Sequence, residues 1–273
     1  MVRRRFPLLG AVGLLSRAPL GAAANPGRLR RDLGLDALIV NAATPADGAA
    51  LDRAGFWRLA APRGVVMLPL TGGQTGWLGR MDGKWRNRLR HAQRQPLTIT
   101  VEDFAPDAAH WLLRADSDQQ RARGYRNLSP ILIAAMAATP GAMTLVAART
   151  DDAPIAAMLF ARHGQTASYL VGWSNAQGRA MSAHNVILWQ AMGHLAGRGV
   201  AVIDLGVDTP GRGAGLVRFK TGAGGQWHAL GGTWLDARLS APLHARKRRL
   251  RATPPPPATA AHAPGARPGF PTR

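Results

Sequence analysis

The 273-residue chain contains no cysteine, which excludes disulfide bonds and thiolate metal sites and fits a reducing compartment. Acidic residues are few: 15 Asp and Glu stand against 35 Lys and Arg, so the formal charge is +20. Lysine is scarce as well, since Lys84, Lys220 and Lys247 are its only occurrences and every other basic residue is arginine. A charge of this size favours anionic partners such as tRNA, phosphorylated substrates or a membrane surface.

Long apolar runs are also missing. The N-terminus has the basic start and the small residues of a secretory signal, but its apolar run, 6–15, is interrupted soon afterwards by Arg17 and Pro19. That run is about ten residues, whereas a membrane span needs about 18 or more. We therefore expect no transmembrane segment and a cytoplasmic protein, with a cleaved signal as the open alternative.

One helix is predicted with particular clarity. Hydrophobic residues make up 46% of the chain, which is enough for a packed core. Trp85, Leu89 and Ala92 recur at helical spacing and predict an amphipathic helix over 82–95. Asp82 is its expected N-cap.

The remaining elements follow from apolar runs and turn residues. Strands are expected at 36–42, 61–70, 97–104, 143–149, 155–162, 167–173 and 200–205, with a hairpin-like pair at 226–237. Further helices are expected at 27–36, 47–55, 107–124, 129–140 and 182–199, and a loop at 71–76. This order predicts an α/β fold with a mixed sheet that carries helices on both faces.

The composition changes near the C-terminus. We expect three regions: a short N-terminal region over 1–80, a main domain over 81–237 and a basic, proline-rich tail over 238–273. The tail contains four consecutive prolines and no acidic residue, so we expect it to be disordered. A solvated tail is the favoured interpretation, and peripheral contact with anionic membrane or RNA is the alternative.

Four segments together resemble the FemABX-like aminoacyl and peptidyl transferases. They read "KWRNRLRHAQRQ", "ASYLVGWSNAQGRAMSAHNVILWQAM", "GVAVIDLGVD" and "GLVRFKTGAGG", and the resemblance covers about residues 81–236. It implies a GNAT-like acyltransferase fold, with a shortened GNAT-like half before it. It also implies transfer of an acyl or aminoacyl group onto an amine, as family members do when they modify peptidoglycan precursors.

The resemblance also implies the substrates. The donor would be aminoacyl-tRNA or acyl-CoA, the acceptor would carry an amine and could be a cell-wall precursor, and no bound cofactor would be needed. An acyl-CoA-dependent N-acyltransferase of the same fold is one alternative. A non-catalytic nucleic-acid-binding protein is another, suggested by the charge, although the sequence has no recognised binding module.

The pair Phe219–Lys220 is the main candidate for catalysis. Amine attack on an ester or thioester places negative charge on the carbonyl oxygen, and a fixed cation stabilises that charge. In the family that the chain resembles, the lysine of this pair serves in transfer. We expect Phe219 to fix a strand end that presents Lys220, and Gly222 to keep the surroundings open to the donor. The alternative is a surface lysine at a strand end.

The predicted helix over 82–95 carries a basic stripe. Arg86 and Arg90 lie on one face with Arg94, and Lys84 lies beside them. Arginine binds phosphate through two parallel hydrogen bonds, so the stripe could hold tRNA, CoA or another phosphorylated substrate. A solvated helix face is an equally good interpretation.

Tyr169 and Asp204 are the remaining catalytic candidates. Tyr169 could orient a substrate or donate a proton to a leaving group, with a core tyrosine as the alternative. Asp204 ends a predicted strand and could cap the following turn or accept a proton from the attacking amine. The loop at 175–182 lies where CoA-using members of the fold bind pyrophosphate, but its residues match that motif poorly. The histidines show no metal-binding spacing, so no metal is expected.

Overall fold

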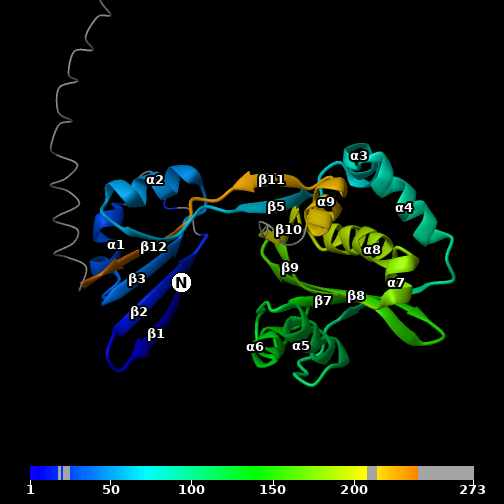
Figure 1. Ribbon diagram of the computed structural model, residues 1–273, viewed down its shortest axis with the longest axis horizontal. Coiled ribbons are helices and arrows are strands. Elements are labelled where there is room, and N and C mark those ends of the chain that lie inside the picture. Colours follow the sequence, from blue (N-terminus) through cyan, green and yellow to red (C-terminus); the bar gives the residue numbers. More distant parts are fainter. Residues whose placement is uncertain (18–19, 21–24, 208–213, 239–273) are drawn as a thin grey trace, which may run out of the picture. The chain divides into compact units, whose positions relative to one another are not determined.

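The computed structural model describes residues 1–17, 20, 25–207 and 214–238 of the chain. Its internal contacts divide the chain into two units, each with its own sheet (Figure 1). The second unit is Ala61–Gly232, and the first unit consists of Met1–Ala60 together with the residues from Thr233 onward. These boundaries differ from the predicted ones at 80 and 237. The predicted tail lies outside the described residues from 239 on.

The first unit is a five-stranded sheet with the order β1-β2-β3-β12-β4. Its strands are β1 (Val2–Phe6), β2 (Gly10–Ser16), β3 (Ala37–Asn41), β4 (Trp57–Ala60) and β12 (Thr233–Ala237), and its helices are α1 (Pro26–Asp32) and α2 (Pro45–Arg53). The N-terminal apolar run forms β2, which pairs in parallel with β3. Leu38, Leu51 and Phe56 are among the most buried residues of its core.

The second unit is a seven-stranded mixed sheet with the order β11-β5-β10-β9-β8-β7-β6. Its strands are β5 (Gly64–Pro69), β6 (Thr98–Asp103), β7 (Met143–Thr150), β8 (Ala153–His163), β9 (Thr166–Ser174), β10 (Val202–Val207) and β11 (Gln226–Ala229). The five strands predicted between 97 and 205 all lie in this sheet, as expected. The mixed α/β fold class is therefore confirmed.

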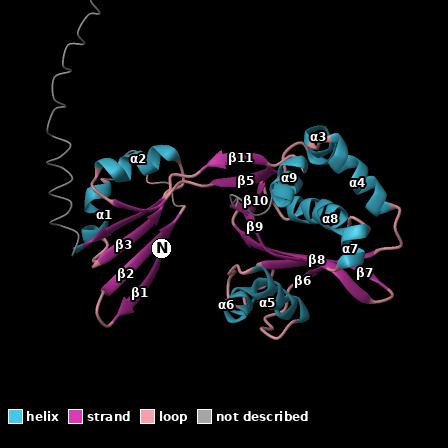
Figure 2. Ribbon diagram, in the orientation of Figure 1, coloured by secondary structure: helices cyan, strands magenta, loops and turns pink. Residues whose placement is uncertain are grey.

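Helices cover both faces of this sheet (Figure 2). They are α3 (Gly73–Arg80), α4 (Gly83–Gln93), α5 (Trp111–Arg123), α6 (Pro130–Ala137), α7 (Ala176–Ala180), α8 (Ala183–Gly197) and α9 (Ala214–Gly222). In Figure 1, α5 and α6 lie on one side of β7 and β8 and α8 lies on the other. Among the described residues, no helix is long and apolar enough to cross a membrane.

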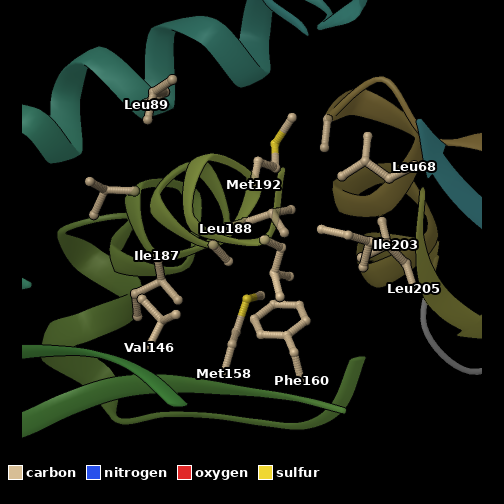
Figure 3. Packing of buried hydrophobic residues seen from close by; sticks show 14 of the residues in the cluster. Leu68, Leu89, Val146, Met158, Phe160, Ile187, Leu188, Met192, Ile203 and Leu205 are labelled. Atoms are coloured by element: carbon tan, nitrogen blue, oxygen red, sulfur yellow. The ribbon is translucent and has the colours of Figure 1, made fainter. Parts of the chain in front are cut away.

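Two hydrophobic clusters occupy the two faces of the larger sheet. In the larger one, Met158 and Phe160 of β8 point toward Leu188 of α8 (Figure 3). The predicted apolar face of α4 joins this cluster, since Trp85, Leu89 and Ala92 are buried in it. The smaller cluster packs under α5 and α6.

The compact second unit begins earlier than the domain predicted from residue 81, because it also contains β5 and α3. β5 pairs with both β10 and β11, although the sequence places it far from either. The predicted loop at 71–76 is also wrong, because α3 begins at Gly73. Trp77 of α3 is buried, and its indole N–H donates to the Leu70 carbonyl at 3.0 Å. Burying this large side chain stabilises α3, although the glycines in this segment are typical of a loop.

The expected hairpin over 226–237 is wrong as well. β11 pairs antiparallel with β5 in the second unit, whereas β12 pairs with β3 and β4 in the first. The connection includes Gly232, whose φ is 88°. Two adjacent strands with the same alternation can thus join different sheets, because short-range pattern does not specify the pairing partner.

Candidate active site

The candidate site lies where two parallel strands separate. β9 and β10 pair over only three positions, and the last pair is Ser168 with Asp204. β9 continues to Ser174 and β10 to Val207 without further pairing between them. We call this place the fork. Backbone groups that leave a ladder here become available to other partners.

β10 bends just beyond the fork. Its register against β5 shifts between Asp204 and Val207, and Gly206 has a φ of 85° in the left-handed region. A carboxylate oxygen of Asp204 accepts from the Gly206 N–H at 2.8 Å and holds the bend. Asp204 is 5% exposed. The structure therefore gives Asp204 the role of fixing the turn, which is one of its two predicted roles.

Lys220 is buried next to this bend. It lies in the last turn of α9, and its Nζ donates to the Gly206 carbonyl at 3.4 Å. The side chain is only 5% exposed, and a lysine is almost never buried to this extent unless it is paired. The expectation of a lysine at a strand end was wrong, since Lys220 stands on a helix. The surface alternative is excluded by its burial.

Phe219 holds α9 against two other helices. Its ring lies 5.9 Å from Trp85 of α4 and 6.3 Å from His184 of α8, measured between ring centroids. Phe219 still fixes the element that carries Lys220, but that element is the helix α9 instead of a strand end. Burial lowers the pKa of His184, so its ring is neutral at pH 7.

Gly222 is a point of close contact between α9 and α4. The Asp82 N–H donates to the Gly222 carbonyl at 3.0 Å, and the Asp82 carboxylate caps α4 through the Trp85 N–H. A Cβ at Gly222 would lie 2.5 Å from a carboxylate oxygen of Asp82. The structure thus gives Gly222 a packing role, and contact between Gly222 and a donor stays a prediction.

Tyr169 follows Ser168, the last residue of β9 that pairs with β10. Its ring lies 5.7 Å from that of Phe160, and its hydroxyl lies against Gly172. Burial raises the pKa of Tyr169 well above its ordinary value, and the neighbouring Tyr125 and Asp116 raise it further. The phenol therefore keeps its proton at neutral pH, so it can donate a hydrogen bond or a proton but cannot serve as a base.

The basic stripe of α4 divides into two kinds of residue. Arg86 is half-buried, and one of its nitrogens donates to the Leu78 and Met81 carbonyls, both at 3.0 Å, which closes the end of α3. Arg90 and Lys84 are exposed, and Arg90 donates to its neighbour Asn87 at 3.2 Å. Arg90 and Lys84 are free to approach a phosphorylated substrate, whereas Arg86 already has a structural task.

The segment predicted as a loop over 175–182 is mostly helical. Asn175 caps α7, and a Cβ at Gly178 would lie 2.3 Å from the Ile155 carbonyl oxygen, so α7 is pressed onto β8. α8 then begins after Ser182, which has a φ of 55° and forms no side-chain cap. In the first turn of α8, Asn185 is 4% exposed and its side-chain nitrogen has no hydrogen-bond partner among the described residues.

Sequence reasoning missed two residues of this site. Gly206 stands directly after a buried strand in the segment "GVAVIDLGVD", and a glycine in that place signals a bend. No pattern in the sequence marks His184. Among the described residues no group of three or more His, Asp or Glu side chains could hold a metal ion.

The geometry defines a class of protein. A mixed sheet whose parallel strands separate beside a buried cation suits the binding of an acyl group, and this is an acyltransferase fold. The chain belongs to the acetyltransferase (GNAT) family, whose domain model matches residues 80–221, more than half of the chain. The predicted acyltransferase activity is thus confirmed, and the alternative of a non-catalytic nucleic-acid-binding protein is wrong.

Solved structures share the fold. FemX has 14% sequence identity and a TM-score of 0.67, over 89% of this chain and 85% of FemX. The C-terminal domain (DUF2156) of a putative lysylphosphatidylglycerol synthetase from Agrobacterium fabrum has 15% identity and a TM-score of 0.54, over 82% and 75%. A conserved protein of unknown function from Bacteroides thetaiotaomicron has 14% identity and a TM-score of 0.50, over 76% and 71%. No curated protein sequence matches the chain.

Proposed function

We propose that this acyltransferase moves an aminoacyl group from aminoacyl-tRNA to an amine of a cell-wall precursor in the cytoplasm. The observation that carries the proposal is the buried Lys220 ammonium, which α9 holds at the Gly206 carbonyl beside the fork. A preorganised cation that is shielded from water stabilises a developing oxyanion far more than an exposed one does. FemX, the neighbour with the strongest likeness of the three, supports the choice of this reaction class.

The reaction needs one bond formed and one broken. The neutral acceptor amine attacks the ester carbonyl of the donor, and the carbonyl oxygen becomes negative near Lys220. The C–N bond forms, the C–O bond to the ribose breaks, and the amine proton passes to water or to Asp204. We assign Tyr169 to protonating the departing ribose oxygen, because it follows Ser168 at the fork and its phenol carries a proton at neutral pH.

The surface of α4 supports a large phosphorylated donor. Lys84 and Arg90 are exposed on this helix, and its first turn adjoins α9 through the bond between Asp82 and Gly222. A donor bound at the fork could therefore extend its phosphates along α4. α7 fills the segment that would form a phosphate loop for CoA, which favours the tRNA donor over CoA.

Acyl-CoA is the second candidate donor, and one observation favours it. The first turn of α8 has no side-chain cap, and the amide nitrogen of Asn185 lies buried there without a partner in the part of the chain that the structure describes. Phosphate oxygens bind well at the uncapped N-terminus of a helix of this length. The acceptor would again be an amine, and Lys220 would act on a thioester carbonyl.

Mass spectrometry of acceptor mixtures tests the proposal directly. The purified chain is incubated in parallel with charged tRNA, acetyl-CoA and longer acyl-CoA, each with amine acceptors that include peptidoglycan precursors. The expected result is an aminoacyl mass added to the precursor only with charged tRNA. Transfer only from a CoA thioester would replace the proposal with the second candidate, and transfer to amines unrelated to the cell wall would overturn the acceptor.

A matched pair of variants connects any transfer to the site. Lys220→Met removes the charge and keeps the length of the side chain, whereas Arg53→Met removes an exposed cation of α2 in the first unit, which does not contain the proposed site. Circular dichroism confirms that both remain folded. Transfer that survives Lys220→Met at the parent rate would place the reaction elsewhere in the molecule.

A further inference from the structure

The helix α6 has an unusual composition for its position. Its sequence, PILIAAMA, contains no polar side chain. A helix that is apolar on every side is normally buried. In α6 only Ile133 and Ala137 are buried, whereas Ile131 is 77% exposed and Leu132 is 47% exposed. Packing against the sheet therefore uses one side of α6 and leaves an apolar surface on the other.

An aromatic residue and a hollow adjoin this surface. Tyr125, in the connection from α5 to α6, is 38% exposed. A hollow of about 620 Å³ lies between the end of α5 and the start of α6, and its lining includes Ser117, Tyr125, Arg126 and Leu128. The Tyr125 hydroxyl is bonded to Asp116 and Gln119, so the exposed part of this residue belongs to its apolar ring.

The exposed charges around α6 that form no salt bridge within the described ranges are positive. Arg123 and Arg126 are exposed, and within the described ranges neither takes part in a salt bridge. The nearby Asp118 pairs with Arg121. Asp116 is buried and so presents no charge to an approaching partner. The side of the molecule that exposes Ile131 and Leu132 is therefore positive.

The connection before α6 is firmly attached to the core. The Tyr125 hydroxyl donates to Asp116 at 3.0 Å, and the side-chain amide of Asn127 donates to the Leu170 carbonyl at 2.8 Å. Leu170 lies on β9 two residues beyond the last pair of the fork. The apolar surface is thus a fixed feature of the second unit, anchored to the strand that forms the candidate site.

We propose that this side of the molecule docks on an anionic lipid bilayer. The α6 surface consists of Arg123, Tyr125, Arg126, Ile131 and Leu132. Ile131 and Leu132 enter the boundary between headgroups and acyl chains, Tyr125 lies at headgroup level, and the two arginines contact lipid phosphates. Charge complementarity favours a bilayer as the partner. The exposed apolar side chains match the acyl chains, and the arginines beside them match the anionic headgroups. The proposal does not depend on the transfer reaction.

The absence of cysteine allows a specific test. A single cysteine introduced by Ile131→Cys carries an environment-sensitive fluorophore at that position alone. Leu78→Cys is the matched control, because Leu78 of α3 is also an exposed apolar residue, with 39% of its surface accessible. Phosphatidylglycerol-containing vesicles should shift the emission of the label at 131 to the blue and leave the label at 78 unchanged. Pure phosphatidylcholine vesicles should shift neither.

Paired charge variants separate the α6 surface from the net charge of the chain. Arg123→Gln with Arg126→Gln should weaken partition into anionic vesicles by roughly 5-fold for each arginine removed. Arg53→Gln with Arg58→Gln lowers the net charge equally, from exposed positions in the first unit, and should change partition less. Equal losses in the two double variants would show that net charge alone drives binding and would overturn the proposal.

Other occupants of the α6 surface give different outcomes. A second copy of the chain would cover it if sedimentation without vesicles showed self-association that Ile131→Asp abolished. A label at 131 that stayed unshifted on every vesicle would show that the α6 surface does not dock on lipid. Either result, or an equal shift of the labels at 131 and 78, would contradict docking on a bilayer. Because Ile131 is exposed, its variants are expected to fold as the parent does.

Discussion

At the scale of single residues, the site depends on a lysine that the fold withdraws from water. Most lysines stay exposed because transferring an ammonium from water to a protein interior is costly. α9 buries Lys220 and directs its Nζ to the Gly206 carbonyl, so the cation is fixed before any substrate binds. Fixing the charge in advance removes the reorganisation that a mobile surface lysine would need.

Substitutions at Lys220 test this role. Lys220→Met and Lys220→Ala should each lower turnover by ~10²-fold or more, because the developing oxyanion loses its cation. Lys220→Arg should restore little activity, because a planar guanidinium cannot occupy the place of a compact ammonium. Turnover is measured under saturating donor and acceptor, with thermal melting as the folding control. Full activity in Lys220→Arg would mean that any cation suffices there, and full activity in Lys220→Ala would remove Lys220 from the mechanism.

Gly206 should be intolerant of a side chain for reasons of backbone conformation. Its φ of 85° disfavours L-residues, so Gly206→Ala should cost about 1–2 kcal/mol and disturb the carbonyl that Lys220 contacts. We expect a lower melting temperature together with a lower turnover. Gly193→Ala is the control: Gly193 lies inside α8 with nothing near its would-be Cβ, and alanine there should be neutral or stabilising. Unchanged activity in Gly206→Ala would separate the bend from catalysis.

His184 should make stability depend on pH. Burial lowers its pKa from 6.5, so at mildly acidic pH the unfolded chain binds a proton that the folded chain does not. Its contribution to stability is therefore complete above 6.5 and is lost as the pH falls below that value. Urea unfolding at several pH values should show a shallower loss on acidification for His184→Gln than for the parent. The exposed His163→Gln serves as the control, and an identical pH slope in parent and His184→Gln would contradict the prediction.

At the scale of elements, the sequence identified α4 well. The spacing of its apolar residues and the Asp82 cap appear in the structure as predicted. α9 was missed, because the glycines after Lys220 suggested a loop and only contact with α4 and β5 shows why a helix forms there. Helices this short are marginal by themselves, so tertiary packing decides whether they form.

The two arginines of α4 should behave differently when changed. Arg90→Glu should raise the Michaelis constant for the donor more than it lowers turnover, because loss of a phosphate contact weakens ground-state and transition-state binding alike. The affinity of the parent should also fall with added salt. Arg86→Ala should mainly lower the melting temperature, because two carbonyls at the end of α3 lose their donor. If Arg90→Glu binds the donor as the parent does, the exposed face of α4 is only solvated.

At the scale of the whole molecule, the sheet of the first unit is completed by β12, a strand that follows the second unit in the sequence. β12 supplies the strand between β3 and β4, and Asp236 on it pairs with Arg30 of α1 at 3.0 Å. Both side chains are largely buried, at 15% and 10% exposure. Segments about 200 residues apart in the chain therefore stabilise the same sheet.

Breaking this ion pair should destabilise the first unit selectively. Asp236→Ala leaves the Arg30 guanidinium largely buried without its carboxylate, which costs about 3–5 kcal/mol at such sites. Hydrogen exchange should rise in β3 and β12 and stay unchanged in β7 and β8. Asp118→Ala, which breaks the exposed pair with Arg121, is the control and should have little effect. Equal loss of protection in both sheets would show that the two units unfold together.

The sequence by itself determined the reaction class, the mixed sheet from β6 to β10 and the helix α4. Each of these rests on local periodicity or on contiguous motifs, which are properties of neighbouring residues. Only the tertiary structure decided that β5 and β11 join the larger sheet, that β12 returns to the smaller one, and that Lys220 is buried on a helix at the fork. These outcomes depend on pairing and burial between distant segments, and local pattern carries no information on which distant segment a strand or helix will meet.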